Sequence, residues 1–89
     1  MNNKLINWRK QIDILDEKIL IALAKRAGIT RKIGRFKKKQ KMSILDKKRR
    51  GDILKSNLKK AQSLGLSKNF IKNLLTSIHK YSLTIQEES

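Results

Sequence analysis

The sequence predicts an all-α protein with one long helix followed by two shorter ones. Two observations predict this class. The 89 residues contain no Pro and only four Gly, and Leu, Ile and Lys, which all favour helices, are abundant. Apolar residues also recur every three or four positions, and nowhere do they alternate with polar residues as in a strand. A chain of this length suffices for one small domain, which we expect to span residues 1–89.

The first helix is predicted over about residues 4–39, because a continuous apolar stripe follows one of its faces. The stripe consists of Leu5, Trp8, Ile12, Leu15, Ile19, Ala22, Ile29, Ile33 and Phe36. Arg26 falls on the same face, between Ala22 and Ile29, and is the one residue there that is unsuited to a core. Such a helix is a rod of roughly 50 Å, whereas a globule of this chain length has a radius of gyration of about 12–13 Å. The uncovered stripe therefore predicts an intertwined homodimer.

The second helix is predicted over about residues 44–64, after a basic run at 37–41 in which the apolar pattern stops. Ser43 is its expected N-cap, with Asp46 at the capping-box spacing. Gly65 is the expected stop signal. Its apolar face consists of Ile53, Leu54, Leu58, Ala61 and Leu64.

The third helix is predicted over about residues 67–87, with Ser67 as its N-cap. Its apolar stripe consists of Phe70, Ile71, Leu74, Leu75, Ile78 and Ile85. Ser82 falls on the same stripe, and Gln86 follows four residues later, so the two form a polar pair on one face.

Composition excludes several classes of protein. Lys and Arg number 23 against 7 Asp and Glu, so the formal net charge is 23 − 7 = +16. With 38% hydrophobic and 34% charged residues, the chain is too apolar for a disordered polycation and too charged for a membrane protein. The absence of Cys and the single His79 argue against thiolate and His-rich metal sites. The N-terminus has no signal-peptide core, and we expect a cytoplasmic protein without a membrane partner.

Several polar residues suit the binding of an anion. Arg26 and Lys37 are three helical turns apart and share a face to within about 20°. Arg9 lies roughly 25 Å from Arg26 along the rod and about 260° around it, so it reaches such a pocket only from the partner of an antiparallel dimer. Together with Ser82 and Gln86, these side chains suit a small molecule with several anionic oxygens. Each cation taken alone is also explained by a packed stem with a solvated charge.

Five motifs, in order, resemble the all-helical chorismate mutases. They are WRKQIDILDEKIL at 8–20, KR at 25–26, IGRFK at 33–37, DKKR at 46–49 and SLTIQ at 82–86. The resemblance covers roughly residues 5–86 and needs no gap between motifs. It implies three-helix protomers in an intertwined dimer, with two sites that each use both chains. It also implies conversion of chorismate to prephenate by a [3,3] rearrangement, without a cofactor, metal or covalent intermediate.

The resemblance implies roles for individual side chains. Arg26 and Lys37 are expected to bind the substrate carboxylates from one chain, and Arg9 from the other. Lys37 and Gln86 are expected to bracket the ether oxygen, which becomes more negative as its bond to the ring breaks. These residue types fit the chemistry, because a pericyclic reaction is accelerated by selecting the reactive conformer and stabilising the developing charge.

Around the ring hydroxyl the chain departs from the family's pattern. Asp46 is expected to help hold this hydroxyl, and Arg49 and Ser82 to complete the shell around a carboxylate. Four residues after Asp46 the family usually has a Glu that accepts a hydrogen bond from the hydroxyl, and this chain has Arg50 at that substrate-binding position. Asp52 is about 200° from Asp46 around a helix, which predicts a poor substitute.

The sequence therefore predicts a chorismate mutase of phenylalanine and tyrosine biosynthesis that binds chorismate and acts as a homodimer. Because of Arg50, the related pyruvate lyases that act on isochorismate stay an alternative, as does a relative without turnover. A basic helical nucleic-acid-binding protein is the alternative of another class. The aromatic content of 4% and the spread of cations along the whole chain argue against it.

A few further residues carry weaker expectations. Trp8, Tyr81 and His79 are interpreted as packing or surface residues. Gly28 and Gly34 cost helix stability, about 1 kcal/mol each relative to Ala, and are expected to allow a close approach of another helix.

Overall fold

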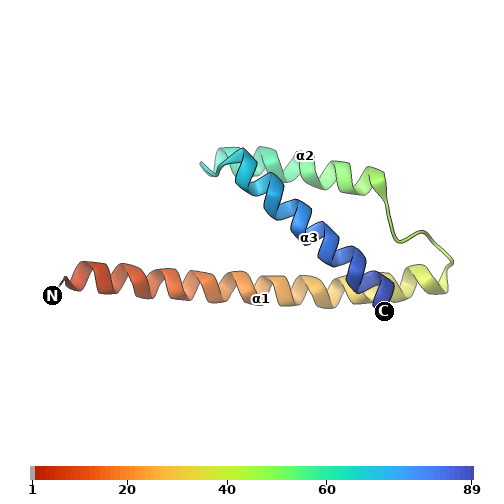
Figure 1. The fold of residues 1–89 in the computed structure, drawn as a ribbon, viewed down its shortest axis with the longest axis horizontal. Helices are drawn as coiled ribbons and strands as arrows, with labels where there is room; N and C mark the ends of the chain where they lie inside the picture. Colours follow the sequence, from red (N-terminus) through yellow and green to blue (C-terminus); the bar gives the residue numbers. More distant parts are fainter. Residues whose placement is uncertain (1) are drawn as a thin grey trace.

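The computed structural model describes residues 2–89 and contains three helices in the predicted order. Helix α1 spans Asn3–Lys39, α2 spans Lys47–Ser63 and α3 spans Lys68–Glu88. In Figure 1, α1 is a straight rod, and α2 and α3 form a hairpin that folds back over its C-terminal part. The prediction of an all-α chain with one long and two shorter helices is confirmed.

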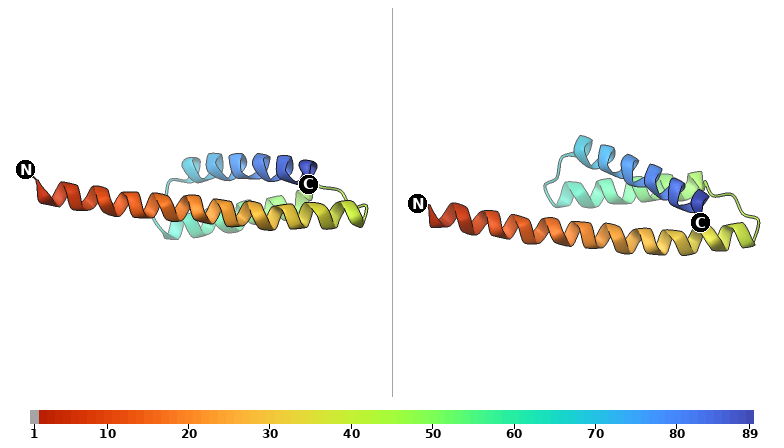
Figure 2. Two further views of the ribbon diagram at one scale, coloured as in Figure 1. Left: turned by 90° about the horizontal axis from the view of Figure 1, so that it is seen from below. Right: turned by 60° about the horizontal axis from the view of Figure 1, so that its bottom comes forward.

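The N-terminal part of α1 extends beyond the hairpin, as the two further views in Figure 2 also show. The molecule measures 60 × 25 × 15 Å, and its radius of gyration is 16.8 Å. That radius exceeds the value of about 12–13 Å expected for a compact chain of this length. No helix within residues 2–89 combines the length and hydrophobicity that a bilayer crossing requires.

The start of α2 corrects the sequence-based expectation. Asp46, not Ser43, is the N-cap: its Oδ1 accepts a hydrogen bond from the backbone N–H of Arg49 at 3.0 Å. Ser43 instead donates from its hydroxyl to the carbonyl of Leu45 at 3.2 Å, and the helix begins at Lys47. A carboxylate is favoured at this position because it carries negative charge next to the positive end of the helix.

The turn between α2 and α3 has the predicted signals. Gly65 adopts a φ of +76°, which a residue without Cβ reaches at no steric cost. Ser67 caps α3 by accepting a hydrogen bond from the backbone N–H of Phe70 at 3.3 Å. The roles of Gly65 as a stop and Ser67 as an N-cap are confirmed.

Helix α3 is the central element, because it packs against both α1 and α2. The face that α1 turns toward it is made of small side chains, with Ala27, Thr30 and Gly34 buried. A Cβ built on Gly34 would lie 2.8 Å from the Cα of Gln86, so the expected close approach is confirmed there. Around Gly28 nothing within residues 2–89 comes within 4 Å of such a Cβ.

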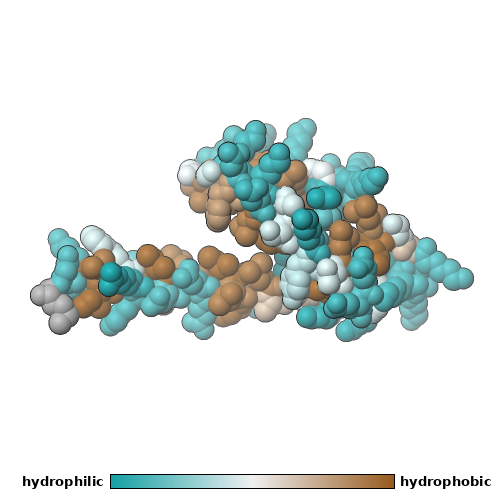
Figure 3. Space-filling view, in the orientation of Figure 1, coloured by the Kyte–Doolittle hydropathy of each residue, from teal (hydrophilic) through white to brown (hydrophobic). Residues whose placement is uncertain are grey.

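The apolar stripe of α1 is not covered by the described chain. Its large side chains, from Leu5 to Phe36, are 39–59% exposed. Figure 3 shows brown apolar surface along α1, including the part beyond the hairpin. A contiguous apolar face of this length is typical of surfaces that bind another protein or a membrane.

Candidate active site

A cavity of about 510 Å³ is lined by residues from all three helices. Four cationic side chains line it, and one carboxylate: Arg26, Arg49, Arg50, Lys60 and Asp52. Ile53, Leu54, Leu75 and Ile78 supply apolar wall. An apolar wall with an excess of cations suits a small organic anion.

Arg26 and Ser82, both predicted site residues, are brought into direct contact. The Arg26 Nη1 donates a hydrogen bond to the hydroxyl oxygen of Ser82, and that hydroxyl donates to the carbonyl of Ile78 at 2.9 Å. Ser82 is buried on α3, whereas Arg26 extends from α1. The bond therefore fixes the Arg26 guanidinium between two helices at the cavity wall.

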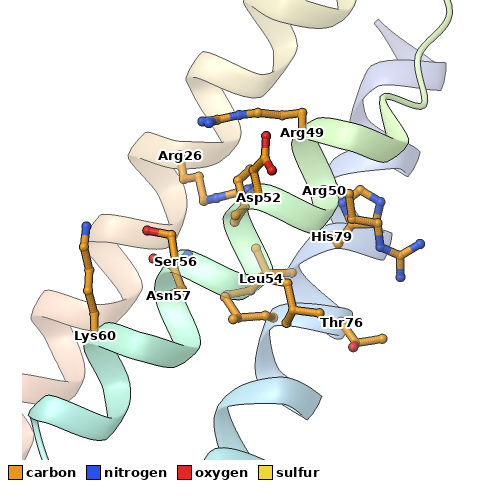
Figure 4. Close-up of a pocket in the computed structure, with 13 residues that line it drawn as sticks. Arg26, Arg49, Arg50, Asp52, Leu54, Ser56, Asn57, Lys60, Thr76 and His79 are labelled. Atoms are coloured by element: carbon orange, nitrogen blue, oxygen red, sulfur yellow. The ribbon is translucent and has the colours of Figure 1, made fainter.

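Arg49 and Arg50 both line the cavity from the first turn of α2, but on different sides. Figure 4 shows Arg49 extending toward α1, whereas Arg50 extends toward α3 and lies next to His79. Asp46 is not among the lining residues, because its carboxylate caps α2. The structure thus groups Arg26, Arg49 and Arg50 around one space, and Asp46 does not line it.

Lys37 and Gln86 lie farther along the molecule. Lys37 is eleven residues from Arg26, about 16 Å along α1, and its ammonium donates to the carbonyl of Ile44 at 2.9 Å. Gln86 is buried beside Gly34, one turn before Lys37, and its Oε1 has no hydrogen-bond partner within residues 2–89. Neither side chain lines the 510 Å³ cavity of the single chain.

Arg9 is exposed on the N-terminal part of α1, away from the other predicted site residues. Its position, 17 residues before Arg26, places it roughly 25 Å from that side chain along the rod. The single chain therefore leaves Arg9 apart, as its place in the sequence predicts.

The comparisons with known proteins identify the family of this chain. The profile of the family described as chorismate mutase type II matches residues 8–87. The chain belongs to the chorismate mutase type II family. The T-protein of Enterobacter agglomerans is similar, with 30% identity over 85 residues, which make up 96% of this chain and 23% of the T-protein. The chain thus spans about a quarter of the length of this curated relative.

Membership of this family of isomerases confirms the resemblance on which the sequence-based prediction was built. The matched range includes every predicted site residue, from Arg9 to Gln86. It also includes Arg50, so the departure expected from the sequence at this position lies within the matched range.

Two residues that line the cavity were not among the predicted site residues. Asp52, expected to be a poor substitute for the missing Glu, lines the cavity together with Arg26 and Arg49. That it replaces the Glu poorly stays a prediction, but the angle behind it was measured from Asp46, which caps α2 and does not line the cavity. Its signal in the sequence was its spacing of three residues from Arg49.

His79, interpreted as a packing or surface residue, also lines the cavity. It is half-buried, and its Nε2 is buried without a hydrogen-bond partner within residues 2–89. Burial first, and then the positive charges of Arg50 and Arg26, lower the pKa of His79 below its usual value of 6.5. The sequence signal was its position three residues before Ser82 on the same helix face.

Proposed function

We propose that this chain catalyses the rearrangement of chorismate to prephenate, in the synthesis of phenylalanine and tyrosine. The observation that carries the proposal is the Arg26 guanidinium, which Ser82 fixes at the wall of a cavity that Arg49 also lines. A dicarboxylate needs two such cations, and the planar, bidentate donors of Arg match a carboxylate. Family membership supports the same reaction.

The side chains act by position and charge. Arg26 and Arg49 hold the carboxylates so that the substrate is bound in its compact, reactive conformer. One C–O bond breaks and one C–C bond forms, with no proton to transfer, so a general acid or base is not needed. Lys37 and Gln86 stabilise the ether oxygen as it gains negative charge. To reach the substrate, the Lys37 ammonium gives up its hydrogen bond to the carbonyl of Ile44.

The proposed active form is a homodimer with two shared sites. The exposed stripe of α1 supports it, because a second rod packed on that face removes a large apolar surface from water. An antiparallel arrangement of the rods carries Arg9 to the site of the partner. The cytoplasmic location stays a prediction from composition.

The test follows the loss of chorismate absorbance with the purified protein and identifies the product. We expect prephenate, and we expect Lys37→Ala and Gln86→Ala to abolish its formation while both variants stay folded. Lys39→Ala is the matched control, because Lys39 is exposed on the same helix and outside the proposed site. An inactive wild-type protein, or variants that retain full activity, contradict the proposal.

Arg50 favours one second candidate within the same class. An arginine in place of a glutamate changes the charge of the hydroxyl-binding side by two units. The assay is therefore repeated with isochorismate as the substrate. Pyruvate as the product assigns the chain to the lyases instead. Salt-sensitive binding of nucleic acid in competition with chorismate supports the nucleic-acid alternative.

A further inference from the structure

Three polar side chains form one row along α3, which we call the α3 row: His79, Ser82 and Gln86. Their spacing places them within about 60° of one another around the helix. Ser82, in the middle, receives the hydrogen bond from Arg26. Within residues 2–89, the buried side-chain nitrogen and oxygen atoms that have no hydrogen-bond partner are His79 Nε2 and Gln86 Oε1. The two unpartnered atoms therefore belong to the neighbours of Ser82 in this row.

An unpartnered buried polar atom is a position where a ligand gains affinity. Such an atom has already lost its hydrogen bonds to water when the chain folds. A hydrogen bond to a ligand therefore adds to the binding free energy without a further desolvation penalty at this atom. Gln86 has a place in the proposed reaction, and His79 has none. Yet His79 lines the cavity that Arg26 and Arg49 line, on the side where Arg50 lies.

The substrate has one polar group that the cations do not serve, the ring hydroxyl. Its hydrogen needs an acceptor inside the cavity. Asp46 does not line the cavity, and its Oδ1 accepts from the backbone of Arg49. Arg50 offers only donors. Ser56, Asn57 and Thr76 also line the cavity and can accept a hydrogen bond. On the side of Arg50, Figure 4 shows the imidazole of His79 next to the guanidinium.

We propose that His79 binds the ring hydroxyl of the substrate through a hydrogen bond to its imidazole, and so replaces the acceptor that Arg50 lacks. The inference rests on the proposed function and deepens it, because it assigns the residue that recognises the hydroxyl.

The charges around His79 favour the neutral imidazole that this role requires. Burial and the guanidinium groups of Arg50, from α2, and Arg26, from α1, lower its pKa. Arg49 and Lys60 add positive charge to the same cavity, and Asp52 is the carboxylate that opposes them. A neutral imidazole carries one lone pair and one N–H. A hydroxyl, which both donates and accepts, can pair with the lone pair.

Asp52 is the one competing carboxylate among the lining residues, and its side chain is exposed. An exposed carboxylate gains less from a hydroxyl, because each new hydrogen bond replaces one to water. The buried imidazole nitrogen has no such bond to lose. The experiment therefore compares the two residues directly.

The test measures kcat/KM for chorismate and for an analogue whose ring hydroxyl is replaced by hydrogen, each divided by its uncatalysed rate. We expect the wild-type protein to prefer the hydroxyl-bearing substrate by about tenfold or more, the size of one buried hydrogen bond. The preference should disappear in His79→Leu and persist in Asp52→Leu, because both substitutions remove the acceptor. His79→Gln, whose amide also accepts, should retain part of it and serves if His79→Leu fails to fold.

Each outcome decides the inference. An unchanged preference in both folded His79 variants overturns it, and a preference lost in Asp52→Leu instead assigns the hydroxyl to that carboxylate. These results leave the proposed function intact, because the wild-type protein still forms prephenate. A wild-type protein without turnover removes the proposed function and the inference together.

Discussion

The two ends of α1 differ in how their apolar faces are covered. Toward its C-terminus, small side chains at Ala27, Thr30 and Gly34 let the backbone of α3 approach within contact distance of the rod. Toward its N-terminus, large residues such as Trp8 and Ile19 stand more than half exposed. One end is complete within the chain and the other is not. A single helix thus packs within its own domain at one end and leaves an apolar face exposed at the other, on which we propose that a second copy packs.

The largest effect is expected from a substitution that interrupts the apolar stripe of α1. Ile19→Asp places a charge in the middle of the exposed apolar face, which should convert the proposed dimer to monomers and lower the helical content. Ile21→Asp is the matched control, because Ile21 is also exposed but lies about 200° away around α1. Sedimentation and circular dichroism measure both. If Ile19→Asp leaves the oligomeric state unchanged, the stripe is not the dimer interface.

An intermediate effect is expected toward the C-terminus of α1, where the helix packs against α3. Gly34→Ala places a Cβ 2.8 Å from the Cα of Gln86, which should lower the free energy of unfolding by about 1–3 kcal/mol. Gly28→Ala meets nothing within 4 Å in the described chain and should raise it by up to about 1 kcal/mol. Urea unfolding compares the two. Equal responses at both positions would contradict the assignment of Gly34 to the close helix contact.

The smallest effect is the response to acid. Because the folded pKa of His79 lies below its ordinary value of 6.5, the unfolded chain binds this proton first as the pH falls. The free energy of unfolding should therefore decrease from about pH 6.5 down to the lowered pKa, and level off below it. His79→Gln should lack this decrease. Urea unfolding across this range checks it, and parallel curves for both proteins would exclude the effect.

Local periodicity explains what could be predicted from the sequence. The three helices, the Gly65 stop and the offset of Arg9 from Arg26 all depend on residues close together in the chain or on the geometry of one helix. The start of α2 was wrong because Ser43 and Asp46 are both good caps. The choice between them depends on the path of the turn before α2, where Lys41 adopts a φ of 54°.

The cavity depends on contacts between helices, which periodicity does not describe. Asp52 and His79 face the same space only because α2 docks on α3 at one particular rotation. The polar spacing from Ser82 back to His79 was visible in the sequence. Without the packing of α2, however, it could not be distinguished from a solvated helix face.

The central claim is that two chains share each chorismate mutase site, and mixing inactive variants tests it most directly. Arg9→Ala and Arg26→Ala damage different halves of a site, so each homodimer should be inactive. In a mixed dimer, one of the two sites receives Arg9 and Arg26 intact. After unfolding and refolding an equal mixture, we expect chorismate turnover to return to about a quarter of the wild-type value, because half the dimers are mixed and each has one intact site. A mixture as inactive as its components would contradict the shared site.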